Sequence, residues 1–90
     1  MKYAFLKQIA LYNGFNGNDL RAILILCGHK MKAKELSEIT GWDKGNASRV
    51  LKKLTESGVA KRLETDNGVF YMANTGWESP EVPGQLTMQL

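Results

Sequence analysis

A cluster of basic and amide side chains near the middle of the chain is best suited to recognition chemistry. Lys44, Asn46 and Arg49 lie within two turns of one predicted helix, beside Gly45. An arginine guanidinium pairs bidentately with guanine and an asparagine amide with adenine. Gly45 leaves space for a close approach. We therefore expect these four residues to contact base edges in the major groove of double-stranded DNA.

Other polar side chains near this cluster suit contacts with the sugar–phosphate backbone. These expected backbone contacts are Ser48, Lys52, Lys53 and Lys34. A predicted hairpin adds expected wing contacts at Lys61, Arg62 and Asn67, although the carboxylate of Asp66 argues against deep insertion of the hairpin tip. The alternative for the whole basic face is an ordinary solvated helix surface.

The helix that carries this cluster is predicted from about Lys44 to Ser57. Asp43 suits the N-cap, and Gly58 followed by Val59 is typical of a helix C-terminus. Apolar residues at helical spacing share one face: Ala47, Val50, Leu51 and Leu54. The basic residues then face outward.

A shorter helix is predicted just before it, over residues 33–40. Ala33, Leu36 and Ile39 are expected to point inward, and Gly41 is expected to end the helix. Only three residues separate the two helices, and the aromatic ring of Trp42 in this turn is expected to close the core.

Two further helices and a hairpin complete the predicted elements. The first helix spans 1–12 and is apolar around most of its circumference. The second begins after an Asn18 N-cap and ends at a left-handed Gly28, with a short extended segment at 30–32. Strands are predicted at 59–64 and 69–75, joined by a turn containing Asn67-Gly68.

This order of elements predicts a mainly α protein with a small β-hairpin (α+β): a winged helix-turn-helix of three core helices plus wing, with an extra N-terminal helix. The expected winged helix domain is 1–77, with recognition helix 44–57 and wing 59–75. Residues 78–90 hold both prolines and no basic residue, and are expected to form a C-terminal arm or tail.

The segments AKELSEITG and SRVLKKLTESG, followed by the basic hairpin, resemble winged-helix regulators of the MarR-like type. Small phage, plasmid or archaeal winged-helix proteins and replication-initiation domains resemble the chain equally well. The resemblance covers about Asn18 to Thr75 and implies DNA binding and transcription regulation. We expect no counterpart of the long C-terminal helix of full MarR-like repressors, so their dimer and ligand pocket are not carried over.

Composition excludes several other classes. The 90 residues carry a net charge of +3, with the basic residues concentrated in the middle third of the chain. One cysteine, Cys27, forms no intramolecular disulfide, and with His29 it makes neither a metal site nor a nucleophile pair, so we expect no metal and no cofactor. We expect no enzymatic activity, no membrane contact, and a cytoplasmic or nucleoid-associated location.

Three functional hypotheses stay open. The first is a sequence-specific regulator of transcription, and the second is a DNA-binding accessory in replication or partition of a mobile element. The third is a winged-helix protein-interaction module whose basic face binds an acidic partner. The aromatic residues of the first helix either form a homodimer interface or complete a thin core, and Trp77 has the same two interpretations.

Overall fold

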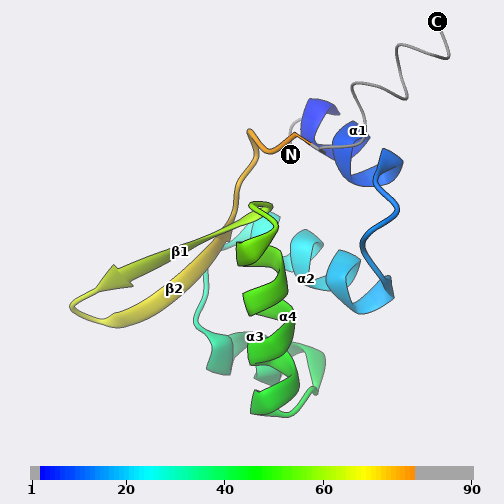
Figure 1. Ribbon diagram of the computed structural model, residues 1–90. Coiled ribbons are helices and arrows are strands. Elements are labelled where there is room, and N and C mark those ends of the chain that lie inside the picture. Colours follow the sequence, from blue (N-terminus) through cyan, green and yellow to red (C-terminus); the bar gives the residue numbers. More distant parts are fainter. Residues whose placement is uncertain (1–2, 79–90) are drawn as a thin grey trace, which may run out of the picture.

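A computed structural model describes residues 3–78 of the chain (Figure 1). Four helices precede one hairpin: α1 (Tyr3–Leu11), α2 (Gly17–Gly28), α3 (Ala33–Thr40), α4 (Lys44–Glu56), β1 (Ala60–Thr65) and β2 (Gly68–Ala73). The predicted α+β class and the order of elements are confirmed. The predicted C-terminal arm lies outside the described residues apart from Glu78.

Helix α4 forms as its sequence pattern predicts. The Asp43 side chain accepts a hydrogen bond from the backbone N–H of Asn46 at 2.7 Å, which caps the first turn. The four predicted apolar residues are all buried. Ser57 is the C-cap rather than the last helical residue, and Gly58 adopts a φ of 88° that favours glycine.

The caps of α2 differ from the prediction. Asn16, not Asn18, is the N-cap, because Asn16 and Asp19 form a capping box: each side chain accepts a hydrogen bond from the other residue's backbone N–H, at 2.9 and 3.0 Å. The expected left-handed cap at Gly28 is wrong as well. Gly28 stays inside the helix, and His29 follows as an extended C-cap.

The turn between α3 and α4 has the predicted glycine stop. Gly41 has a φ of 80°, and its N–H donates to the carbonyl of Ser37. Leu36 is fully buried, but the expectation that Ile39 points inward is wrong, since it is 60% exposed. Ile39 lies in the last turn of this eight-residue helix, of which Leu36 is the buried residue, so a single fully buried apolar position anchors α3 to the core. Trp42 is partly buried against the core, as expected.

The two strands pair antiparallel, with Ala60 opposite Ala73 and Thr65 opposite Gly68. The hairpin loop is therefore Asp66-Asn67, and Gly68 carries the positive φ of 120°. On the other edge of β2, Met31 forms a backbone bridge with Tyr71, which confirms the extended segment predicted around it. The hairpin projects from one side of the helices (Figure 1).

An aromatic group joins α1 to the rest of the core. Phe5 on α1 is 1% exposed, and the rings of Tyr12 and Phe15 lie 5.5 and 5.6 Å from that of Trp77. The Trp77 indole N–H donates to the carbonyl of Ser57 at 2.9 Å. Of the two interpretations of Trp77, its 7% exposure supports the core. This arrangement holds the chain after β2 against the C-terminal end of α4.

Candidate nucleic-acid interface

Helix α4 has two faces of opposite character. Its buried side packs into the core, and the opposite side carries Gly45, Arg49, Lys52 and Glu56 at the spacing of one helical stripe. Arg49 and Lys52 are exposed, and neither forms an ion pair with a described carboxylate. Their charges are therefore free to meet an external anion.

Three of the predicted base-contacting residues, Lys44, Gly45 and Asn46, lie in the first turn of α4. Lys44 is exposed at the first helical position, and Gly45 has only the Asp43 carboxylate, at 3.5 Å, near the place where a Cβ would be. Asn46 is half-buried, on the flank of α4 that Lys53 shares. The structure thus places Lys44, Gly45 and Arg49 at one accessible end of the helix, with Asn46 beside them.

Lys53 is separated from the other predicted backbone contacts. Its Nζ lies 2.5 Å from Oδ2 of Asp19 on α2, and the Asp19 side chain is almost fully buried. The ammonium of Lys53 is thus already paired within the domain. Lys34 and Ser48 are exposed, at the start of α3 and on α4 respectively.

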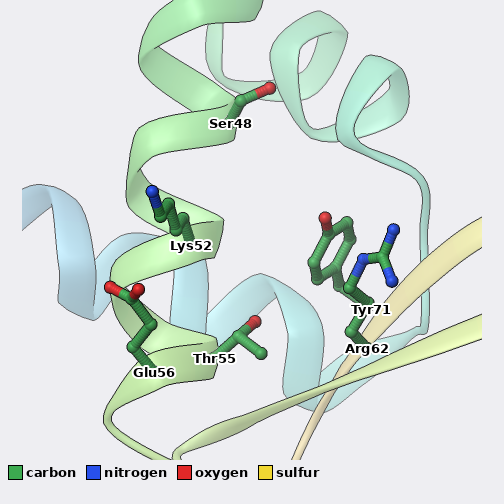
Figure 2. A pocket seen from close by; sticks show the side chains of 6 residues that line it. All are labelled: Ser48, Lys52, Thr55, Glu56, Arg62 and Tyr71. Carbon is green, nitrogen blue, oxygen red and sulfur yellow. The ribbon is translucent and has the colours of Figure 1, made fainter.

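A groove of about 310 Å³ runs between α4 and the hairpin. It is lined by Ser48, Lys52, Thr55, Glu56, Arg62 and Tyr71. Figure 2 shows Arg62 and Tyr71 side by side on the hairpin, with Ser48 and Thr55 on the side of α4 that faces them. The helix and the wing thus form the two walls of one concave surface.

The wing has fewer unpaired cations than its sequence suggests. The Arg62 guanidinium forms an exposed ion pair with Glu64, which stands two residues further along the same strand face. The guanidinium donates a hydrogen bond to the Glu64 carboxylate and is also hydrogen-bonded to Tyr71, and these two interactions, the one with Glu64 first, raise the pKa of Arg62. Lys61 lies on the opposite face of the strand, and Asn67 is exposed in the hairpin loop.

Two acidic residues of this surface were not anticipated. Glu56 lines the C-terminal end of the groove, and Glu64 neutralises Arg62. The signal was present in the sequence, since Glu56 follows Lys52 by four residues and Glu64 follows Arg62 by two. Both carboxylates repel phosphates, which restricts the cationic surface of α4 to the part from Lys44 to Lys52.

No group of three metal-binding side chains occurs among residues 3–78, and no helix in that range has the length and hydropathy of a membrane span.

The sequence of residues 13–68 matches the family model described as the MarR family. The chain belongs to the MarR family. The order of its helices and hairpin agrees with this membership, since α3 and α4 form a helix-turn-helix and β1 and β2 form the wing.

A solved structure supports the fold of this MarR-family chain. The "Multiple Antibiotic Resistance Repressor, MarR" superposes with a TM-score of 0.65 at 20% sequence identity. The match covers 93% of this chain and 60% of that protein, so the chain spans less than two thirds of the repressor's length. No curated protein matches the sequence.

Proposed function

We propose that this MarR-family chain binds a specific double-stranded DNA sequence and regulates transcription, with the N-terminal half of α4 in the major groove. The observation that carries this proposal is the stripe of α4 opposite its buried face. Arg49 and Lys52 are exposed there without a carboxylate partner among the described residues, next to the open space at Gly45.

The geometry supports base contacts near the start of α4 and phosphate contacts on the side of α4 that faces the wing. Lys44, Asn46 and Arg49 lie nearest the helix start, which is the part of a recognition helix that meets base edges. Ser48 and Lys52 face the groove beside the wing and suit phosphate oxygens. Lys34 is exposed at the start of α3, the first helix of the motif, and in this proposal it contacts the DNA backbone that such a helix crosses. Such a regulator acts in the cytoplasm or the nucleoid.

The decisive experiment selects bound sequences from a random duplex pool and then titrates the best one in gel shifts. Arg49→Ala should weaken binding by about 1–3 kcal/mol and relax the preference at one base pair, because a bidentate guanine contact is lost. Lys7→Ala is the matched control, since Lys7 is exposed on α1. Selection of no common sequence, or equal effects of the two substitutions, would contradict the proposal.

A further inference from the structure

The hairpin has a second face, turned away from α4. The isolated Met31–Tyr71 bridge, with hydrogen bonds of 2.9 and 2.7 Å, places Met31 and its two neighbours along the free edge of β2. Side chains alternate along strands. Because Arg62 and Tyr71 face the groove beside α4, Lys61, Phe70 and Met72 lie on the other side. We call that side the outer face.

Lysines surround the apolar centre of the outer face. The Nζ atoms of Lys30 and Lys32 each lie 5.4 Å from the centroid of the Phe70 ring, and Lys61 stands opposite Met72. None of these lysines forms an ion pair with a described carboxylate. Two ammonium groups held against one ring repel each other, and an anion between them would relieve that repulsion.

A hollow of about 330 Å³ continues the outer face toward the end of α2. It is lined by Leu26, Cys27, Gly28, His29, Lys30, Met72, Ala73 and Thr75. Lys30 and Met72 belong both to the hollow and to the outer face. A ligand that placed an apolar group in the hollow would therefore hold its neighbouring groups close to the lysines.

We propose that the outer face binds an acidic protein segment that carries an apolar side chain between carboxylates. The apolar side chain enters the hollow beside Met72, and the carboxylates bridge Lys30 and Lys32. Charge complementarity selects the acidic segment. A duplex seated on α4 lies on the opposite side of the sheet, so the regulator holds both partners at once.

Single-stranded nucleic acid is the less suitable occupant. Proteins that bind it stack successive bases on several aromatic rings. Phe70 is the one ring that the described residues place on the outer face, and lysine side chains already lie against it. The surface thus offers carboxylate-binding cations around an apolar centre rather than a stacking platform.

Fluorescence anisotropy with the full chain tests this proposal. The probe is a labelled synthetic peptide in which a Leu-Phe pair is flanked by Asp and Glu residues. We expect saturable binding that weakens about tenfold or more in Lys30→Glu and in Lys32→Glu, since the new carboxylates repel the peptide. Lys7→Glu, on α1, makes the same change in charge and should preserve most of the affinity.

Alkylation of Cys27, the single cysteine of the chain, locates the peptide. Burial raises the pKa of the Cys27 thiol, so its reaction is slow, and bound peptide should slow it further. Absence of saturable binding, equal loss in Lys7→Glu, or no protection of Cys27 would overturn the proposal. So would tighter binding of a single-stranded oligothymidylate that depends on Lys30 and Lys32. Duplex binding, measured in the same variants, reports separately on α4.

Discussion

At the scale of single residues, the Asp19–Lys53 pair changes the role of one predicted DNA contact. Asp19 is 1% exposed, and its carboxylate also accepts the backbone N–H of Asn16. Lys53 is about half-exposed and supplies the counter-charge from α4. The spacing of Lys53 on α4 gives no hint of this contact, because the two residues are 34 positions apart. Lys53, which the sequence predicts to contact a phosphate, thus links α4 to α2.

Removal of the Lys53 ammonium should therefore destabilise the fold. We expect Lys53→Met to lower the free energy of unfolding by about 1–3 kcal/mol, because a buried carboxylate loses its counter-charge while the apolar stem is kept. Lys53 is partly solvated, so the loss should stay below that for a fully buried pair. Urea unfolding measures it, and Lys52→Met on the exposed stripe is the matched control, expected to change stability by no more than about 0.5 kcal/mol. Equal stabilities of the two variants would show that the pair contributes little.

At the scale of elements, the sequence predicts the bounds of a helix correctly where the signals lie within a few residues of each other. The course of α4 follows from the Asp43 cap, the helical period of its buried residues and Gly58, all of which act within a few positions. The start of α2 was missed because Asn16 and Asn18 are equally good cap residues alone, and only the partnership with Asp19 decides between them. The groove beside α4 depends on how the hairpin packs, which strand alternation does not determine.

The wing offers a prediction at this same scale. Glu64 neutralises Arg62, so Glu64→Gln should free the guanidinium for a phosphate oxygen. We expect tighter binding to the selected duplex, and the slope of log affinity against log salt should become steeper by about one contact. Gel shifts at several salt concentrations measure both quantities.

Glu38→Gln is the matched control for that change, because Glu38 is an exposed carboxylate on α3 outside the recorded ion pairs. General loss of negative charge would strengthen binding equally in both variants. Unchanged affinity and salt slope in Glu64→Gln would mean that Arg62 does not reach the DNA.

At the scale of the whole molecule, the described part of the chain leaves apolar surface uncovered. Phe5 completes the core from one side of α1, but Tyr3 is 78% and Leu6 40% exposed on the same helix. On α2, Leu24 is 56% exposed. The two interpretations of the first helix are therefore compatible: one side of α1 packs inward, and the other is available to a second copy of the chain.

We expect the chain to form a homodimer through this outer side of α1. Leu6→Lys should weaken the dimer by placing a charge in the apolar contact while leaving the buried Phe5 in place. Sedimentation equilibrium measures the change, and Asn13→Lys, which adds the same charge at an exposed polar position just after α1, is the control. A twofold dimer also predicts a nearly palindromic site with half-sites about 10 base pairs apart, or a multiple of that. Leu6→Lys should then bind a single half-site normally and lose the extra affinity of the paired site. A wild-type chain that stays monomeric both free and on the paired site would remove the dimer and leave α4 to act alone.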